Sequence, residues 1–483
     1  MQKLEESKAF SVFKYFKDIS EIPRGSGNEK EISNYLVEFA KKLKLEVTQD
    51  EALNVIIKKA ASKGYENAPT VVIQGHMDMV CEKSIDTVHD FEKDPIKLVI
   101  NGDKIFAKGT TLGADDGIAV AYAMALLADD SIEHPALEIL MTTDEERGMS
   151  GAINLSEDSI KGKILINIDT EEEGYLLVSC AGGIRTKSSI KIKKEKNDDK
   201  ILHIGIRGLK GGHSGMEIDK YRGNANKLMG RVLKEALEFA DIRLVSISGG
   251  SKNNAIPREA DAYLTAKDTE VLIGVVEKFN DIFRKELFTQ DNEVRVFIES
   301  TNENYEDIYS KESTEKVINL LYLYPNGVNT MSANIKNLTE SSSNLGVVTE
   351  ENGYVEFDSA VRSSVPSLKD EIVEKIKSIT HIIGGKFETN SAYPAWEYKK
   401  DSKIRDLCID VYKKMYNKDP IVYAIHAGVE CGVFEEKFGE LDMISFGPNI
   451  KGAHTPEENL SISSTERVWE YLLNILKNID EKY

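Results

Sequence analysis

Short apolar segments that end in polar residues constrain the fold of this chain more than any other feature. Three of them, 70–74 (TVVIQ), 137–143 (LEILMTT) and 164–168 (ILINI), have the length and the unbroken apolar character of buried strands. Residues 118–128 (IAVAYAMALLA) lie between the first two and predict an alanine-rich helix. Strands that alternate with helices in this way are typical of an α/β sheet.

The pattern changes after about residue 185 and returns after about residue 394. Between these points the segment 201–209 (ILHIGIRGL) alternates apolar and polar residues, as a strand with one exposed face does. Further strands and helices follow in the order β-α-β-β-α-β, about twice. We therefore predict a mixed-sheet α/β domain formed by residues 1–185 and 395–483. An α+β domain at residues 186–394 interrupts it and is long enough to hold two such units.

The composition excludes several classes of partner. The chain has 483 residues, too many for one ordinary core, and its 62 basic and 81 acidic side chains give a net charge of −19. This charge argues against nucleic acid and against an anionic membrane surface, whereas it suits divalent cations. The four cysteines contain no CxxC pair, and no segment resembles a signal peptide or a membrane-spanning helix. We therefore expect a cytoplasmic protein.

The candidate site residues share one position, because each lies at the end of a predicted strand or at the start of a predicted helix. They are His76 and Asp78 after the first strand, Glu145 and Glu146 after the second, Asp169 after the third, His454 after a strand near 443–446, and Asp115 at the start of the alanine-rich helix. In open α/β sheets, sites form beyond the carboxyl ends of the strands. Each motif alone is typical of an ordinary loop or helix cap, but their joint occurrence predicts one shared site.

The residue types limit what this site can bind. Two imidazoles and several carboxylates, with no cysteine, suit zinc, cobalt or manganese. The surplus of carboxylates favours two metal ions bridged by one carboxylate and a water. If Glu145 and Glu146 lie in an extended segment, their side chains point to opposite sides. One of them can then bind metal while the other acts as a proton shuttle.

These motifs resemble those of a known family. Residues 75–80 (GHMDMV), 113–117 (GADDG), 142–148 (TTDEERG), Ile168-Asp169 and 452–454 (GAH) are similar to the five metal-site motifs of the M20 metallopeptidases. The similarity extends to 208–215 (GLKGGHSG), 426–434 (HAGVECGVF) and 445–456 (SFGPNIKGAHTP), and covers nearly the whole chain. In this detail the chain resembles the bacterial aminoacyl-histidine (Xaa-His) dipeptidases, also called cytosolic nonspecific dipeptidases.

The resemblance implies a role for each residue of the predicted site. Two divalent ions, most often Zn²⁺ with Co²⁺ or Mn²⁺ as alternatives, would share Asp115 as a bridge. His76 and Asp169 would bind one ion, and Glu146 and His454 the other. Asp78 would orient His76, and Glu145 would be the general base that activates a metal-bridging hydroxide. A cis peptide bond is also implied after Asp115.

The interrupting domain resembles the lid of the family. His213 would stabilise the tetrahedral oxyanion, and Asn254 and Arg362 would hold the carbonyl or the terminal carboxylate of the substrate. Glu430 would either bind the α-ammonium group of the substrate or interact with a helix N-terminus, and the sequence leaves both open. A lid of this length can hold two units, so His213 can act within its own chain, and the sequence leaves a homodimer open.

The implied function is hydrolysis of dipeptides, including Xaa-His dipeptides. One alternative is a deacylase or a peptidase for longer peptides that uses the same metals and base. An alternative of another class is a metal-binding or ligand-binding protein without turnover, which would have no need of Glu145 as a proton shuttle. An interaction scaffold would leave the five clustered motifs unexplained.

Overall fold

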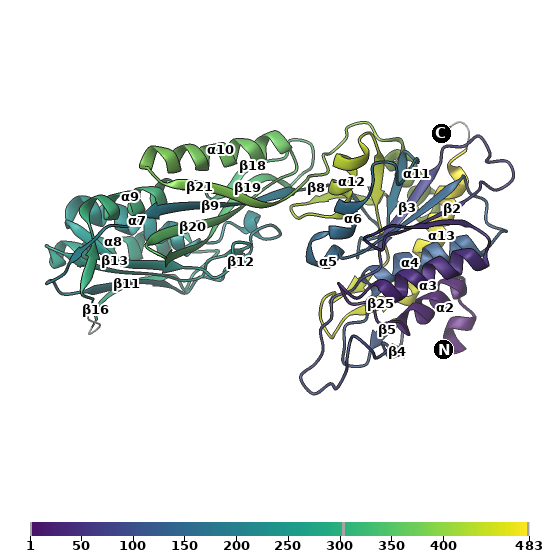
Figure 1. Cartoon of the computed structure of the whole chain (residues 1–483), viewed down its shortest axis with the longest axis horizontal. Coiled ribbons are helices and arrows are strands. Elements are labelled where there is room, and N and C mark those ends of the chain that lie inside the picture. The colour runs from purple at the N-terminus through teal and green to yellow at the C-terminus, as the bar shows by residue number, and fades with distance from the viewer. Residues whose placement is uncertain (1, 302–304, 481–482) are drawn as a thin grey trace. The chain divides into compact units, whose positions relative to one another are not determined.

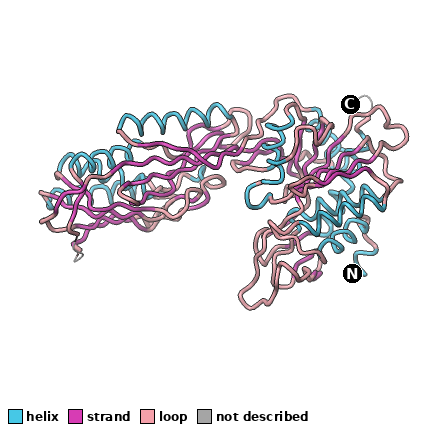
Figure 2. Tube along the Cα trace, viewed as in Figure 1, coloured by secondary structure: helices cyan, strands magenta, loops and turns pink. Residues whose placement is uncertain are grey.

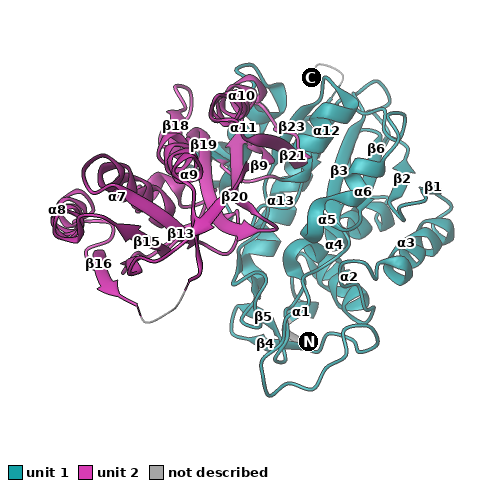
Figure 3. Ribbon diagram, turned by 60° about the vertical axis from the view of Figure 1, so that its left-hand side comes forward, with its two compact units in different colours: residues 1–179, 398–424, 429–483 teal, residues 180–397, 425–428 magenta. Residues whose placement is uncertain are grey.

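The computed structural model describes residues 2–301, 305–480 and 483, and it contains two compact units (Figure 3). Unit 1 consists of Met1–Ser179, Tyr398–Ala424 and Val429–Tyr483, and unit 2 of Cys180–Glu397 and Ile425–Gly428. The mixed α/β and α+β fold class predicted from the sequence is confirmed. The assignment of a catalytic domain to 1–185 and 395–483, and of a lid to 186–394, stays a prediction. No helix in the described ranges is long and apolar enough to cross a membrane.

Unit 1 is built around an eight-stranded sheet in the order β1-β2-β6-β3-β7-β23-β8-β22, with a second sheet in the order β24-β25-β5-β4. Its strands are β1 (Glu46–Gln49), β2 (Val55–Lys59), β3 (Val71–His76), β4 (Leu98–Asn101), β5 (Lys104–Ala107), β6 (Leu137–Thr142), β7 (Ile164–Asn167), β8 (Tyr175–Cys180), β22 (Ile421–Ile425), β23 (Asp442–Ser445), β24 (Ile450–Lys451) and β25 (Asn459–Ser461). Its helices are α1 (Gln2–Glu5), α2 (Phe10–Ser20), α3 (Lys30–Lys42), α4 (Ala114–Ala128), α5 (Glu145–Gly148), α6 (Ser150–Asn154), α11 (Lys403–Tyr416), α12 (Glu430–Phe438) and α13 (Ile462–Asn478). Figure 1 shows helices on both sides of the large sheet.

The alanine-rich helix α4 is central to unit 1. It packs on β3 and on α2, and all its residues from Ala114 to Leu127 are buried. Small side chains allow this close approach: a Cβ built on Gly75 of β3 would lie 2.4 Å from the Cβ of Ala119. The first turn of α4 is irregular, because Asp115 and Asp116 have non-helical dihedral angles.

Unit 2 contains a nine-stranded sheet in the order β16-β11-β15-β13-β19-β20-β9-β21, with β18 paired to β19, and small sheets formed by β10 with β17 and by β12 with β14. Its strands are β9 (Gly182–Lys191), β10 (Lys194–Lys196), β11 (Leu202–Arg207), β12 (Gly212–His213), β13 (Ile242–Gly249), β14 (Ala255–Ile256), β15 (Ala260–Ala266), β16 (Arg295–Ser300), β17 (Asp307–Tyr309), β18 (Gly327–Met331), β19 (Thr339–Glu351), β20 (Tyr354–Ser363) and β21 (Lys386–Tyr393). Its helices are α7 (Ala225–Phe239), α8 (Thr269–Glu286), α9 (Lys311–Leu323) and α10 (Pro366–Ile383), with a 3₁₀ turn at Ile218–Lys220.

The large sheet of unit 2 contains the same strand arrangement twice. In one half, β11, β13, β15 and β16 follow one another along the chain and lie in the order fourth, first, third, second. In the other half, β9, β19, β20 and β21 lie in that same order when they are counted from the opposite edge of the sheet, and the halves meet where β13 pairs with β19. Helices α7 to α10 lie on one face of the sheet (Figure 2), and their apolar side chains form a core with that face. The opposite face carries polar and aromatic side chains, among them His203, which stacks on Tyr263.

Candidate active site

The predicted site residues of unit 1 follow strands that are parallel neighbours. Strands β6, β3, β7 and β23 lie side by side and run in the same direction. Their carboxyl ends therefore meet at one edge of the sheet, where His76 ends β3 and Asp169 lies two residues after β7. Glu145 and Glu146 begin helix α5 just after β6. His454 lies in the hairpin between β24 and β25, where its φ of 62° is left-handed.

Asp115 lies between the two histidines. Its Oδ1 is 3.3 Å from Nε2 of His76, and its Oδ2 is 3.1 Å from Nε2 of His454. Each imidazole also has a second carboxylate, since Asp169 lies 3.6 Å from His76 and Glu146 lies 2.9 Å from His454. The five residues thus form two groups that share Asp115. The peptide bond between Asp115 and Asp116 is cis, as the resemblance implies.

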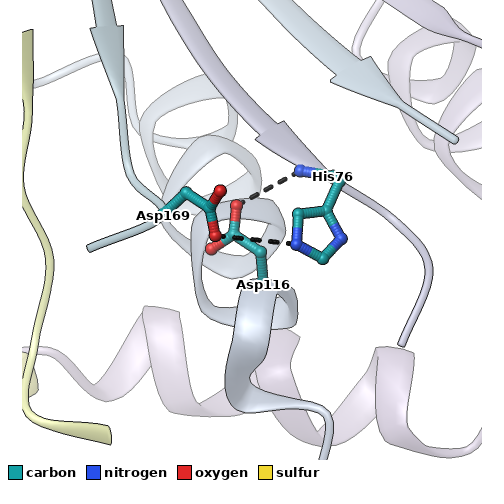
Figure 4. A group of neighbouring side chains, drawn as sticks. All are labelled: His76, Asp116 and Asp169. Carbon is teal, nitrogen blue, oxygen red and sulfur yellow. Dashed lines mark hydrogen bonds and ion pairs between the residues drawn. The ribbon is translucent and has the colours of Figure 1, made fainter. Parts of the chain in front are cut away.

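Asp116 belongs to the same cluster, although no role was predicted for it. Figure 4 shows its carboxylate beside His76 and Asp169, and ligand atoms of the three residues lie within 4.8 Å of one another. Its Oδ2 accepts a hydrogen bond of 3.2 Å from the backbone N–H of His76. Burial raises the pKa of Asp116 well above its usual value. This bond fastens the start of α4 to the end of β3.

Glu145 and Glu146 do not lie in the extended segment that the sequence predicted. Asp144 has a left-handed φ of 57° and starts the short helix α5. Consecutive side chains in a helix diverge by about 100°, so the two glutamates still point in different directions. Both belong to candidate metal-binding groups, Glu146 with Asp115 and His454, and both with His76.

Asp78 contacts both His76 and the backbone at the start of α5. Its Oδ1 lies 3.3 Å from Nδ1 of His76, and its carboxylate also accepts from the backbone N–H groups of Glu145 and Glu146 at 3.1 and 3.3 Å. Burial acts to raise the pKa of Asp78, but the contacts with His76, Ser26 and the Glu145 backbone outweigh it and lower the pKa to about 2. Asp78 is thus an ionised carboxylate that lies beside the His76 ring.

The electrostatics of the cluster suit bound cations. The bonds to Asp115 and Glu146 raise the pKa of His454 to about 11, and burial raises the pKa of Asp169 to about 6. Burial also raises the pKa of Glu145 well above its usual value. Oε1 of Glu146 is buried and lies 2.9 Å from Nε2 of His454. Such a concentration of carboxylates and imidazoles fits divalent metal ions.

Two buried charged residues that sequence reasoning missed support the loop before Asp115. Both oxygens of Glu458 accept backbone N–H bonds, from Leu112 and Gly113 at 2.7 and 2.9 Å and from Ala114 and Asp115 at 2.7 and 3.3 Å. Arg24 donates to the carbonyls of Met77, Asp78 and Gly113. An acid four residues after His454 was a weak signal for Glu458, whereas no local pattern indicates Arg24.

The predicted substrate-binding residues of unit 2 also lie near one another. Strands β12 and β14 pair His213 with Ala255, and Ser214 donates its N–H to the carbonyl of Asn254, so these two segments are adjacent. Nδ1 of His213 accepts from the backbone N–H groups of Gly215 and Met216 at 3.2 and 3.0 Å. Burial, and after it the charge of Arg362, lowers the pKa of His213. The ring is therefore neutral and carries its proton on Nε2.

Glu430 lies at the start of α12 and is fully buried. Its Oε2 accepts from Nε2 of Gln74 at 2.6 Å and from the hydroxyl of Thr142 at 2.8 Å. Burial raises the pKa of Glu430 to about 7. These bonds tie α12 to β3 and β6, which favours the structural interpretation of this residue over contact with a substrate.

The family of the chain follows from comparison with known proteins. Residues 72–478 match the peptidase family M20/M25/M40, so the chain belongs to the M20 family and is a metallopeptidase. It is 40% identical over 486 residues to the cytosol non-specific dipeptidase of Escherichia coli, with 100% of both chains covered. The crystal structure of aminoacylhistidine dipeptidase from Vibrio alginolyticus has a TM-score of 0.95 at 37% identity and covers 99% of each chain. Aminopeptidase PepT from Bacillus cereus, at 15% identity and a TM-score of 0.58 over 98% of this chain and 99% of its own, shares the fold.

Proposed function

We propose that the chain is a metal-dependent dipeptidase whose substrates include Xaa-His dipeptides. The observation that carries this proposal is the position of Asp115, whose two oxygens face the imidazoles of His76 and His454. A carboxylate between two imidazoles suits a bridge between two cations. The names of the E. coli and Vibrio relatives support dipeptides as the substrate class, and the first supports a cytoplasmic location.

The donor atoms would hold two ions. His76 and Asp169 would bind one, Glu146 and His454 the other, and Asp115 both. Zn²⁺ is the ion we propose, with Co²⁺ and Mn²⁺ as alternatives, because imidazole and carboxylate donors accept all three. Bound divalent ions lower the pKa of water and polarise a carbonyl group.

Glu145 would move the proton in the reaction. It would accept a proton from the attacking water and deliver it to the amine that leaves when the peptide bond breaks. Its burial and its position in the group with His76 and Glu146 support this role. Asp78 would keep the His76 ring in the orientation that binding requires.

Unit 2 would act as the lid and bind the substrate. The Nε2–H of the neutral His213 would donate to the carbonyl oxygen as it becomes negative, which stabilises the transition state. Asn254 would contact a substrate carbonyl, and Arg362 the terminal carboxylate, which a guanidinium binds with two parallel hydrogen bonds. All three groups belong to unit 2.

The decisive variant is Glu145→Gln. We expect turnover of a dipeptide to fall by at least 10³-fold, because the amide cannot accept the proton of water, while the metal content stays at the wild-type value. The control is Glu157→Gln, which removes the same charge from an exposed position and should keep full activity. Turnover of Glu145→Gln near the wild-type rate would refute the assignment of the base.

A substrate panel separates the alternatives. Metal-depleted protein would be supplied with Zn²⁺, Co²⁺ or Mn²⁺ and tested on Xaa-His and Xaa-Gly dipeptides, tripeptides and N-acyl amino acids. Hydrolysis of N-acyl amino acids or tripeptides in preference to dipeptides would indicate the deacylase or longer-peptide alternative. Tight metal binding without any hydrolysis would indicate a binding protein.

A further inference from the structure

Four residues form one row across the large sheet of unit 2. Ser342 of β19 pairs with Arg362 of β20, Arg362 pairs with Gly183 of β9, and Gly183 pairs with Tyr393 of β21. Residues that pair directly across neighbouring strands point to the same face of a sheet. Val361 belongs to the core on the helix side, so Arg362 and the rest of its row point to the opposite face.

The glycine in this row allows two distant side chains to meet. Arg362 and Tyr393 lie two strands apart, which is about 10 Å between backbones. A Cβ on Gly183 would lie 2.3 Å from Cζ of Tyr393, so the tyrosine ring occupies the space above this glycine. A Cβ on Gly428 would lie 2.6 Å from Cε2 of the same ring, which is therefore confined from a second direction. The ring directs its hydroxyl to Nη1 of Arg362, which donates a hydrogen bond to it.

A β-bulge places Tyr393 on this face. Asn390 pairs with Arg185, and the next pair is Tyr393 with Gly183, so β21 contains one residue more than β9 between these two points. Ser391, within the bulge, has a left-handed φ of 52°. Without the extra residue, Tyr393 would point to the helix side of the sheet, because side chains alternate between the faces.

The bond to Tyr393 leaves one edge of the Arg362 guanidinium free for a ligand. A guanidinium has five N–H donors, and Tyr393 accepts one of those on Nη1. Nε of Arg362 is buried and has no hydrogen-bond partner in the described part of the chain. Nε and Nη2 form the edge that binds a carboxylate with two parallel bonds. Because the tyrosine fixes Nη1, it determines where this edge points.

We propose that Tyr393 is a positioning residue that acts through Arg362 and makes the enzyme selective for substrates with a free terminal carboxylate. The inference rests on the role proposed above for Arg362. The confined ring supplies a rigid acceptor, so little side-chain freedom is lost when the substrate binds. Selectivity for the carboxylate thus depends on a strand row in which the middle residue must be glycine.

The test compares a dipeptide with the same dipeptide carrying a terminal amide, which removes the negative charge. The metal-loaded Tyr393→Phe variant keeps the ring and loses only the hydroxyl. We expect KM for the dipeptide to rise about tenfold with kcat within twofold, and the preference in kcat/KM for dipeptide over amide to fall about tenfold, as the loss of one hydrogen bond to a charged group predicts. Gly183→Ala should lower this preference at least as much, because its Cβ displaces the ring.

Two further variants control the experiment. Tyr354→Phe removes a hydroxyl that accepts from Lys386 near the other end of the same strands, and should keep the wild-type preference. Arg362→Lys keeps the positive charge and loses the fork, so it should reduce the preference by itself. In the Arg362→Lys background, Tyr393→Phe should cause no further change, since the tyrosine acts only through the arginine.

The outcomes distinguish this inference from the proposed function. An unchanged preference in Tyr393→Phe, or an equal loss in the Arg362→Lys background, would overturn the role of Tyr393 while leaving that of Arg362 intact. A wild-type preference in Arg362→Lys would overturn the role of Arg362 itself. A fall in kcat alone, with KM and the preference unchanged, would contradict a positioning role for Tyr393 in substrate binding.

Discussion

Glu458→Gln tests how the loop before Asp115 is held in place. The glutamate is 2% exposed and accepts four backbone N–H bonds, two on each oxygen. Glutamine has the same shape but only one acceptor oxygen, and its NH₂ group would face two of the four donors. Two buried N–H groups would then lack an acceptor, at about 1–3 kcal/mol each. We therefore expect unit 1 to lose about 2–6 kcal/mol of unfolding free energy.

The assay can follow unit 1 alone, because the two tryptophans of the sequence lie in different units, Trp396 in unit 2 and Trp469 in unit 1. In a Trp396→Phe background, fluorescence during urea unfolding of the metal-depleted protein reports on unit 1. Glu457→Gln, which removes the same charge from an exposed neighbouring position, is the control. If Glu458→Gln and Glu457→Gln unfold within 0.5 kcal/mol of one another, roughly the scatter expected of surface substitutions, the four hydrogen bonds do not stabilise the loop as argued.

Two further predictions concern stability. Burial, and after it the charge of Arg362, lowers the pKa of His426 from 6.5 to about 3, so this residue contributes stability that is complete above pH 6.5 and is lost as the pH falls towards 3, by up to about 1.4 kcal/mol per pH unit. His426→Gln should flatten the stability profile of unit 2 between pH 6.5 and 5, whereas the exposed control His381→Gln should not; equal slopes would contradict the argument. Gly75→Ala should destabilise unit 1 by about 1–3 kcal/mol in urea unfolding, because its Cβ would overlap Ala119. Gly274→Ala, where α8 has free space, should instead stabilise unit 2 by up to about 1 kcal/mol. If both variants are less stable than the wild type, the space around the added Cβ does not determine the sign of the change in unfolding free energy.

The sequence predicts the carboxyl-end residues well because strand ends leave a local signal. An apolar run that stops at His76 or at Asp169 places that residue at the edge of the sheet, whatever the rest of the chain does. The same signal was insufficient for Glu145 and Glu146, since the left-handed Asp144 begins a helix where an extended segment was predicted. A change of backbone direction at one residue does not alter the order of apolar and polar residues, so the sequence pattern does not reveal it.

Other features depend on contacts between distant segments and therefore leave no pattern. Arg24 is buried against the carbonyls of Met77 and Asp78, which lie more than 50 positions further along the chain. The residues next to Arg24 in the sequence therefore do not indicate its burial. The serine-rich start of β19 is buried as well, where Ser342 is bonded to His426 at 2.6 Å. The bulge in β21 shifts the alternation of side chains by one residue, so the face on which Tyr393 lies cannot be read from polarity alone.

The hairpin formed by β24 and β25 has a consequence for the synthesis of the protein. It carries both His454, which belongs to a candidate metal-binding group with Asp115 and Glu146, and Glu458, which anchors the loop before Asp115. Strand β23, which extends the parallel part of the sheet beside β7, comes from the same late region of the chain. A ribosome must therefore translate beyond about residue 461 before the hairpin is complete. A growing polypeptide therefore lacks both His454 and the support of Glu458 until this late region has been made.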